Sequence, residues 1–212
     1  MSVYSYPYKD AEFILNELVG FDALCAGAGL DEVNHELATA VIEEANRLAV
    51  EVMAPLNKVG DKEGATLEDD GVHETPGFKE AYWQYVESGW AGLGFPEDFG
   101  GQGMPKTLAT AVDEIWQSSN LGFSLCFMLT HGAIEALLLH GSDELTETYL
   151  PKLVSGEWTG TMNLTEPQAG SDLAAVTSRA EPEGDHYRVY GQKIFITWGD
   201  HQMTDNVIHL VL

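Results

Sequence analysis

The stretch WTGTMNLTEPQAGSD, residues 158–172, is where the sequence changes from one periodicity to another. Before this stretch, apolar residues recur at steps of three and four, as they do on one face of a helix. After it, Thr, Val, Ile, Tyr and Phe alternate with polar residues, which is typical of strands. This ordered change predicts an α+β fold in which an all-α helical domain precedes a β-domain.

The helical part is predicted to consist of amphipathic helices separated by glycine- and proline-rich breaks. Helices are expected over residues 11–24, 31–55, 76–88, 105–118, 121–140 and 142–155. Pro55 is expected to end the second helix. The core-facing residues of that helix are predicted to be Val33, Leu37, Val41, Ala45, Leu48 and Val52. Residues 58–75 and 90–105 are rich in turn formers and are predicted to be loops.

The part that follows is predicted to form strands over residues 159–165, 173–181, 186–197 and 205–212, with a hairpin turn at 181–185. The last of these strands is apolar and ends at Leu212. An unprotected apolar strand at the edge of a sheet promotes aggregation, and a few short strands make a poor sheet on their own. We therefore expect this chain to be a fragment of a longer protein.

The composition excludes several classes of function. The 10 Lys and Arg against 34 Asp and Glu give a formal net charge of −24, which disfavours binding to nucleic acid and to anionic membrane surfaces. No run of about 18 uncharged apolar residues is present, so no transmembrane helix is predicted. The N-terminus resembles neither a secretory signal nor a transit peptide, and Cys25 and Cys126 are interpreted as buried thiols in a reducing cytoplasm.

Familiar cofactor and metal motifs are absent from the sequence. Gly27 and Gly29 begin a G-x-G pair, but Glu32 stands where the third glycine of a dinucleotide-binding loop belongs. His131 and His140 lie on an apolar helix, and we interpret them as ordinary helix residues rather than metal ligands. The sequence therefore predicts no nicotinamide site and no metal site.

One segment that carries chemistry is TMNLTEPQAGSD, residues 161–172. A strand is predicted to end at Thr165, followed by a proline-set turn and a Gly-Ser-Asp corner. Turns of this kind expose consecutive backbone N–H groups that suit anionic oxygens, and Ser171 adds a hydroxyl donor.

A second segment is GQKIFITWG, residues 191–199. Phe195 and Thr197 would lie on the same face of a strand, where they offer a stacking ring beside a hydroxyl. With the first segment, this pair suits a planar heteroaromatic ring that has a phosphate tail. Each segment alone is more often a tight turn or an ordinary sheet, so the inference depends on having both.

TEPQAGSD (165–172) and GQKIFIT (191–197) resemble the two flavin signatures of the acyl-CoA dehydrogenase family. GFPEDFGGQG (94–103) and GSDELTETYLPKLVSGEWTGTM (141–162) resemble that family's helical loop and its run from helix into sheet. The match extends in order over about residues 76–212. The opening of the chain is similar to the longer bacterial branch of the family, which includes 3-methylthiopropanoyl-CoA dehydrogenase.

The resemblance implies a three-domain protein with FAD between the last two domains. The chain would comprise an N-terminal helical extension (1–35), a helical domain (36–157) and the beginning of an antiparallel, β-barrel-like middle domain (158–212). It would be truncated before the C-terminal helical bundle. In that family the bundle supplies the catalytic base, so no catalytic residue is assigned in this chain, and the chain alone is expected to be inactive.

The resemblance also implies which residues contact the cofactor. Thr165 would hydrogen-bond the polar edge of the flavin ring, Ser171 would reach the FAD pyrophosphate and lie near the acyl-CoA, and Thr197 would lie near flavin N5. Phe195 replaces a common Trp, and Trp198 replaces a common small polar residue, which leaves the conformation of this loop open. The complete set of implied cofactor residues is Met162, Leu164, Thr165, Ser171, Phe195, Ile196 and Thr197.

The implied activity is α,β-dehydrogenation of an acyl-CoA thioester, with an electron-transferring flavoprotein as acceptor and a homodimer or homotetramer as the assembly. Arg179 and Lys193 are candidate contacts for CoA, whereas Glu135 is expected to face outward or to be paired rather than to act as the base. Two alternatives stay open: an acyl-CoA oxidase or nitroalkane-oxidase-like flavoenzyme on the same scaffold, and a non-enzymatic helical interaction module.

Overall fold

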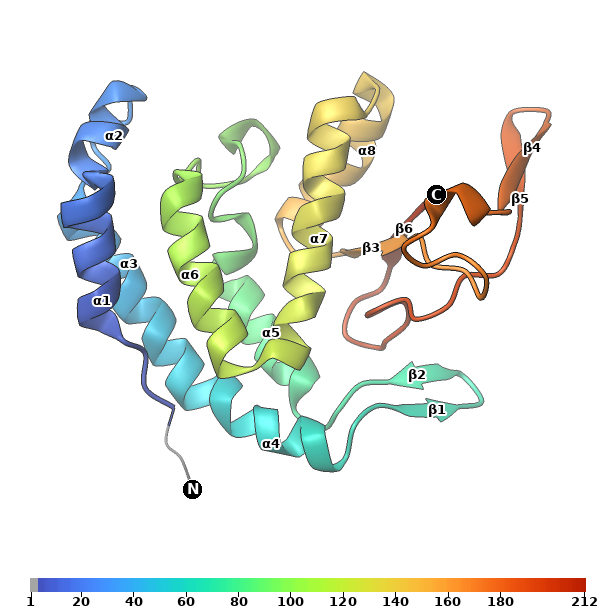
Figure 1. Cartoon of the computed structure of the whole chain (residues 1–212), viewed down its shortest axis with the longest axis horizontal. Helices are drawn as coiled ribbons and strands as arrows, with labels where there is room; N and C mark the ends of the chain where they lie inside the picture. Colours follow the sequence, from blue (N-terminus) through green and yellow to red (C-terminus); the bar gives the residue numbers. More distant parts are fainter. Residues whose placement is uncertain (1–3) are drawn as a thin grey trace.

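The computed structural model describes residues 4–212, in which a series of helices is followed by short strands (Figure 1). The helices are α1 (Tyr8–Phe13), α2 (Phe21–Gly27), α3 (His35–Leu48), α4 (Ala54–Lys62), α5 (Phe78–Glu87), α6 (Lys106–Ser119), α7 (Leu121–His140) and α8 (Asp143–Val154). Shorter π- or 3₁₀-helical turns are η1 (Ile14–Val19), η2 (Ala49–Met53), η3 (Trp90–Gly92), η4 (Glu97–Phe99) and η5 (Leu173–Ala175). The strands are β1 (Thr66–Glu68), β2 (Gly71–His73), β3 (Thr159–Asn163), β4 (Arg179–Glu183), β5 (His186–Tyr190) and β6 (Val207–Val211). This order confirms the predicted α+β class.

Helix α7 lies beside α6 and α8, on the side of the helical part next to β3 (Figure 1). Phe123 and Phe127 of α7 join the larger core, which also holds the buried, unpaired thiols Cys25 and Cys126. Ile134, further along α7, joins a second cluster with residues of α8. Among the described residues, α7 is the one helix that is long and apolar enough to span a membrane by length and composition; in this fold it packs against α6, α8 and β3.

The N-terminal helices begin and end at positions that differ from the predicted ones. Gly20 adopts a left-handed conformation (φ +67°) and separates η1 from α2, so the single helix predicted over residues 11–24 is interrupted. The next helix begins at His35 rather than near Asp31. The reason is that the side chain of Asn34 accepts a backbone N–H of the first turn at 3.0 Å and caps the helix there.

Pro55 does not end the helix, in contrast to the prediction. Helix α3 continues through η2 into α4, and Pro55 lies in the first turn of α4. A proline has no N–H to donate, and the wider π-helical turn of η2 absorbs the resulting shift in hydrogen-bond register. The carbonyl oxygen of Met53 also accepts a hydrogen bond of 3.1 Å from the side chain of Asn120, which ties this turn to the start of α7.

Residues 58–75, predicted as a loop, contain the end of α4 and the antiparallel hairpin β1–β2. Contacts from far along the chain hold this hairpin. Asp200 accepts the N–H of Val72 at 3.0 Å, and Glu74 accepts the N–H of Gln202 at 2.9 Å. These partners lie about 128 residues away in sequence. The composition of residues 58–75 alone shows turn formers and therefore predicted a loop rather than a hairpin.

The strands after α8 form two separate pairs. Strands β4 and β5 are an antiparallel hairpin that turns at Gly184, within the predicted turn, but β4 begins only at Arg179 because η5 occupies the start of the strand predicted over residues 173–181. Strands β3 and β6 are parallel, with Thr159 opposite Val207, whereas the implied barrel-like domain is antiparallel. Parallel neighbours require a long connection between them. Here the connection is residues 164–206, which contain nearly all of the candidate cofactor residues.

Strand β3 packs directly on α7. A Cβ atom added at Gly160 would lie 2.6 Å from the Cβ of Ala133, so the close approach of strand and helix requires glycine. The N–H of Gly160 also donates to the hydroxyl of Thr130 at 3.0 Å. The connection that follows β3 therefore starts from a fixed point on the helical part.

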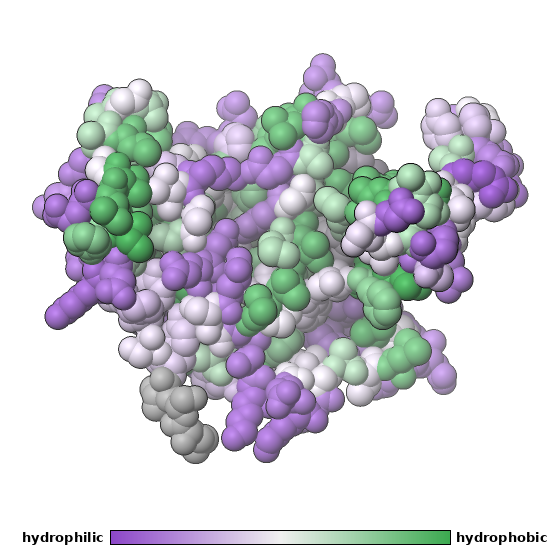
Figure 2. Space-filling model, in the orientation of Figure 1, coloured by the Kyte–Doolittle hydropathy of each residue, from purple (hydrophilic) through white to green (hydrophobic). Residues whose placement is uncertain are grey.

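Apolar side chains also gather on the outer face of α1, η1 and α2, at the left of Figure 2. The exposed large apolar residues there are Phe13, Ile14, Leu18, Val19 and Leu24. A cluster of this kind is larger than the single exposed apolar residues found on any protein surface. Within the described residues, the N-terminal helices therefore bury one apolar face, which includes Leu15 and Phe21, and leave this second apolar face exposed.

Candidate functional site

Glu166 organises the loop that follows β3. Its side chain is buried, and both carboxylate oxygens accept hydrogen bonds. Oε2 accepts from the N–H and the hydroxyl of Thr177, both at 2.9 Å. Oε1 accepts from the N–H of Ser178 at 3.0 Å and from its hydroxyl at 2.5 Å. The amide nitrogen of Gln168 donates to Oε2 at 2.5 Å and to the carbonyl oxygen of Ala175 at 3.2 Å.

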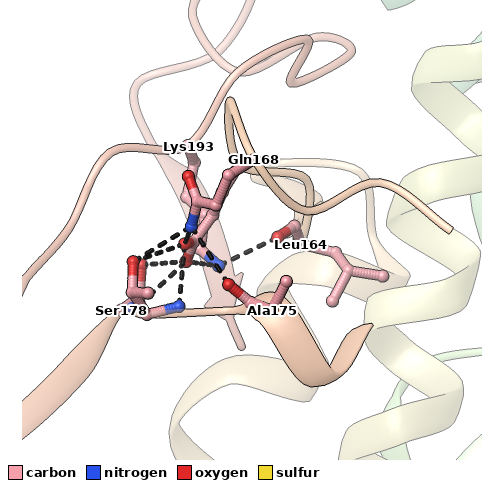
Figure 3. Close-up of polar contacts among 7 residues, drawn as sticks. Leu164, Gln168, Ala175, Ser178 and Lys193 are labelled. Atoms are coloured by element: carbon pink, nitrogen blue, oxygen red, sulfur yellow. Dashed lines mark hydrogen bonds and ion pairs between the residues drawn. The ribbon is translucent and has the colours of Figure 1, made fainter. Parts of the chain in front are cut away.

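Lys193 brings the second segment to the same point. Its ammonium group donates to Glu166 Oε1 and to the carbonyl oxygen of Leu164, both at 2.9 Å (Figure 3). Next to it, the backbone N–H of Ile194 donates to the carbonyl oxygen of Thr165 at 2.9 Å. The two segments singled out from the sequence therefore lie side by side, joined by the Lys193–Glu166 ion pair, by the hydrogen bond from Lys193 to Leu164 and by one backbone hydrogen bond.

The environment of Glu166 favours its charged form. Hydrogen bonds from the Ser178 hydroxyl first, then from Lys193 and from the N–H of Thr177, hold the pKa of the Glu166 carboxyl well below its ordinary value. The side chains of Lys193 and Glu166 are 10% and 1% exposed, so the pair is shielded from water and its charges balance each other. Glu166 is thus a fixed anion that shapes the loop, and its carboxylate is poorly suited to take up a proton.

The predicted residues of the first segment line the surface of this loop. Met162 on β3 is 45% exposed, and the half-buried residues Leu164 and Thr165 follow the strand, which ends at Asn163 rather than at Thr165. Ser171 is exposed in the turn. Over residues 4–212, we find no acceptor for the backbone N–H groups of the exposed residues Gly170 and Ser171.

The second segment is not the strand that was predicted. Strand β5 ends at Tyr190, and Phe195 adopts a left-handed backbone conformation (φ +57°) that breaks the alternation of a strand. The prediction that Phe195 and Thr197 share a strand face is therefore wrong. Phe195 is 88% exposed, Thr197 is exposed and Ile196 is half-buried. The contacts of Lys193 and Ile194 bring these residues to the loop.

Neither candidate contact for CoA is a free cation. Lys193 is engaged with Glu166, and the expectation that it contacts CoA stays a prediction. Arg179 donates to Glu181 at 2.8 Å and lies over the ring of Tyr190, with 4.9 Å from the guanidinium carbon to the ring centroid. Each of these cations already has a carboxylate partner within the chain.

The titratable residues of α7 take ordinary structural roles. Glu135 pairs with Lys106, as predicted. Burial lowers the pKa of His131 to about 4, so its ring is neutral at physiological pH. His140 is exposed at the other end of the helix. The two histidines therefore do not form a shared site.

The structure also groups Glu68, Asp70 and His73 on the hairpin β1–β2, where one ligand atom from each lies within 4.8 Å of the others. These side chains belong to the surface, and His73 Nε2 already pairs with Asp70 Oδ1 at 2.8 Å. These three residues were not predicted as a group because the segment was expected to be a loop. The hairpin is a separate feature from the loop around Glu166.

The donor set around the loop fits a flavin dinucleotide. Phe195 and Met162 offer exposed apolar surface for a planar ring, and the hydroxyls of Thr165 and Thr197 are donors for its polar edge. Ser171 and the backbone N–H groups beside it suit a phosphate. The negative charge of Glu166 does not oppose an anionic ligand because Lys193 neutralises it.

Sequence analysis missed the part played by Glu166, although it quoted the motif that contains this residue. The available signal was the pair of adjacent hydroxyl residues Thr177 and Ser178. Thr177 and Ser178 lie 11 and 12 residues after Glu166. Their hydroxyls can donate to this carboxylate only if the fold brings the two positions together. That information lies in the tertiary structure.

Comparisons with known proteins identify related sequences and structures. A family model described as "Acyl-CoA dehydrogenase, N-terminal domain" matches residues 35–157. 3-Methylmercaptopropionyl-CoA dehydrogenase of Ruegeria pomeroyi is 45% identical over 210 residues, which are 99% of this chain and 36% of that protein.

Two solved structures extend the comparison. A glutaryl-coenzyme A dehydrogenase in complex with glutaryl-CoA has a TM-score of 0.66 at 29% identity, over 77% of this chain and 40% of that one. PigA with FAD and proline has a TM-score of 0.61 at 25% identity, over 75% of this chain and 39% of that one. The chain spans less than half the length of each of these proteins.

Proposed function

This chain belongs to the acyl-CoA dehydrogenase family, and from this premise we propose that it forms part of an FAD-dependent enzyme that converts an acyl-CoA thioester into the 2-enoyl-CoA. In that reaction the substrate loses a proton from its α-carbon and a hydride from its β-carbon. The observation that carries the proposal is the contact between the two flavin-signature segments at Lys193–Glu166 and Ile194–Thr165.

The chain's own residues would hold the cofactor rather than carry out the chemistry. When bound, FAD supplies the acceptor for the hydride. Thr165 and Thr197 would donate hydrogen bonds to the ring, Phe195 and Met162 would cover it and exclude water, and Ser171 would donate to the pyrophosphate. Leu164 and Ile196, both half-buried, would complete the apolar border.

No acidic residue of this chain is proposed as the base that removes the α-proton. Glu166 is held in its charged form by surrounding donors, and Glu135 is paired with Lys106 on the outside of α7. A general base must reach the substrate with a free lone pair and a pKa near the working pH. The proposal therefore assigns this chain cofactor and substrate positioning, with Ser171 near the acyl-CoA.

The substrate class is an acyl-CoA, and the 45% identity to 3-methylmercaptopropionyl-CoA dehydrogenase makes a short thioether acyl chain the first substrate to test. An electron-transferring flavoprotein as acceptor and a homodimer or homotetramer are proposed from the family resemblance. A cytoplasmic location is proposed because the two cysteines are buried, unpaired thiols. We also propose the division into residues 1–35, 36–157 and 158–212.

The test uses the complete reading frame that encodes this chain. The purified protein should contain FAD, and an acyl-CoA substrate should bleach the flavin spectrum under anaerobic conditions. Exposure to oxygen then distinguishes two activities: a dehydrogenase stays reduced until an electron-transferring flavoprotein is added, whereas an oxidase reoxidises at once. A protein that binds neither FAD nor acyl-CoA would contradict the proposal and favour a helical interaction module.

Variants connect the test to the named residues. Thr165→Val and Thr197→Val each remove one hydroxyl donor and should weaken FAD binding by about five- to tenfold, as expected for one hydrogen bond. The matched control is Thr148→Val, because the Thr148 hydroxyl donates to its own helix at the carbonyl oxygen of Glu144. Equal FAD affinity in all three variants would contradict the assignment of Thr165 and Thr197.

A further inference from the structure

The turn that contains Phe195 and Thr197 is a strained part of the backbone. Within residues 4–212, the non-glycine residues with positive φ are Phe195 (+57°) and Trp198 (+54°). An aromatic side chain rarely adopts this conformation because its Cβ crowds the carbonyl oxygen. Two such residues three positions apart persist only where the surroundings hold the backbone in place.

Trp198 provides such a hold, and its partners belong to the helical part. The indole N–H donates to the carbonyl oxygen of Gly122, at the start of α7, at 3.0 Å. The ring stacks on Phe78 at a centroid distance of 6.0 Å and meets Phe123 edge-on at 6.3 Å. Phe78 and Phe123 are both buried in the larger core, so Trp198 packs against that core.

The turn is held at its other end by the β-part. Ile194 donates its N–H to Thr165, and Gly199 closes the turn by donating to the carbonyl oxygen of Ile196 at 3.2 Å. A Cβ atom at Gly199 would lie 2.9 Å from a side-chain carbon of Ile196, so this closure requires glycine. Phe195, 88% exposed, therefore stands between two anchors that come from different parts of the fold.

We propose that Trp198 is a positioning residue for the flavin segment: it ties residues 195–197 to α5 and α7, so that the helical part determines where Phe195 and Thr197 meet the cofactor. This inference rests on the proposed function, because it takes Phe195 and Thr197 as flavin contacts. It goes beyond that function by assigning a role to Trp198, which directly follows the flavin signature 191–197. Trp198 does not itself touch the cofactor in this proposal.

Two substitutions separate the hydrogen bond from the ring. Trp198→Phe keeps a ring that can pack on Phe78 and Phe123 but removes the N–H donor. Trp198→Ala removes both. The matched control is Trp158→Phe, the same chemical change at a partly buried tryptophan that packs against Tyr149 and Lys152 instead.

Hydrogen exchange of this chain measures the anchoring directly. The amides of Ile194 and Gly199 are hydrogen-bonded, and Trp198→Ala should accelerate their exchange by about tenfold or more, while the amides of α7 keep their protection. Trp198→Phe should give an intermediate rate, and Trp158→Phe should match the wild type. Unchanged exchange at Ile194 and Gly199, or an equal loss of protection along α7, would overturn the inference.

The cofactor provides a second measurement, made on the complete reading frame. Trp198→Ala should weaken FAD binding by about tenfold and alter the visible circular dichroism of the flavin, with partial recovery of both in Trp198→Phe. FAD binding that Trp198→Ala leaves unchanged would contradict this inference alone. Absence of FAD binding in the wild-type protein would contradict the proposed function and, with it, the placement of Trp198 at a cofactor site.

Discussion

The helical part and the connection between β3 and β6 are held together by different forces. In the helical part, side chains such as Leu108, Ile115 and Phe123 are fully buried, and burial of apolar surface supplies most of the stability. In the connection, every residue of β4 and β5 is exposed. There the loop is held by the buried carboxylate of Glu166, which accepts hydrogen bonds from the backbone N–H groups of Thr177 and Ser178. Substitutions in the first region should therefore change global stability, and those in the second should change local order.

The largest expected effect tests the apolar half of this comparison. Ile42 on α3 is 1% exposed, and Ile42→Ala should lower the free energy of unfolding by about 2–5 kcal/mol because it removes buried methyl groups and leaves a cavity. The control is the neighbouring Val41→Ala at a half-buried position, where about 1 kcal/mol or less is expected. Urea unfolding measures both, and equal losses would contradict the placement of the core on this face.

Ile42 and Val41 also show how well the buried positions of the helical part could be predicted from the sequence. The period of this helix was predicted correctly, but its buried residues also include Ala38 and Ile42 of α3 and Ala49 and Met53 of η2, in addition to the predicted Ala45 and Leu48. Leu37, Val41 and Val52, predicted to face the core, are only half-buried. The small residues Ala38, Ala45 and Ala49 allow α3 and η2 to pack closely against α6. A prediction that favours large apolar side chains does not identify alanine as a core residue.

The next effect concerns pH and His131. Burial lowers the pKa of His131 to about 4 from 6.5, so the unfolded state binds a proton more tightly than the folded state. Its contribution to stability is complete above pH 6.5 and is lost as the pH falls towards 4, by up to about 3 kcal/mol.

The variant His131→Gln isolates this contribution. Burial raises the pKa of Asp113 to about 6, which makes acidification favour the folded state, so the pH dependence of the wild type alone mixes opposite effects. The difference in free energy of unfolding between the wild type and His131→Gln, both of which contain Asp113, should shift against the wild type on acidification from about pH 7 to about pH 4.5. His140→Gln, at an exposed position, serves as control. A difference that stays constant with pH would show that His131 is not desolvated.

The candidate site was less predictable than the core, for a physical reason. The motifs at residues 165–172 and 191–197 located the two segments, and the structure brings them together at Ile194 and Thr165. The conformation of Phe195 was mispredicted because the alternation of residue types suggested a strand, whereas tertiary contacts of Trp198 and Lys193 fix a turn. Such contacts join residues about 29 and 76 positions apart, which local patterns do not encode.

A smaller and more local effect is expected for Glu166→Gln. The amide keeps the shape of the side chain but loses the charge that Lys193 balances, and its NH₂ group opposes donors of Thr177 or Ser178. Exchange of the Thr177 and Ser178 amides should accelerate, FAD affinity should fall by about tenfold, and global unfolding should stay close to wild type.

The control for Glu166→Gln is Glu157→Gln, which removes an exposed carboxylate paired with Lys152. Its exchange pattern and FAD affinity should match the wild type. If Glu166→Gln instead unfolded the helices as readily as Ile42→Ala, the two regions would not be separable in the way that their contacts indicate. Linkage gives a further check: since the pKa of Glu166 is lowered, its contribution is present at neutral pH and is lost as the pH falls below the ordinary range of a carboxyl.

The smallest effect is expected for the ion pair between Lys106 and Glu135, whose side chains are 62% and 41% exposed. Charges that remain in water gain little from pairing, so a double-mutant cycle with Lys106→Met and Glu135→Gln should give a coupling energy of about 0.2–1 kcal/mol that decreases with added salt. The cycle is needed because Lys106 also lies over the ring of Phe95, with 4.5 Å from Nζ to the centroid, and a single substitution would remove both contacts. A salt-insensitive coupling above about 2 kcal/mol would be typical of a desolvated pair. In that case polar contacts would stabilise the helical part as well, and the contrast with the loop around Glu166 would fail.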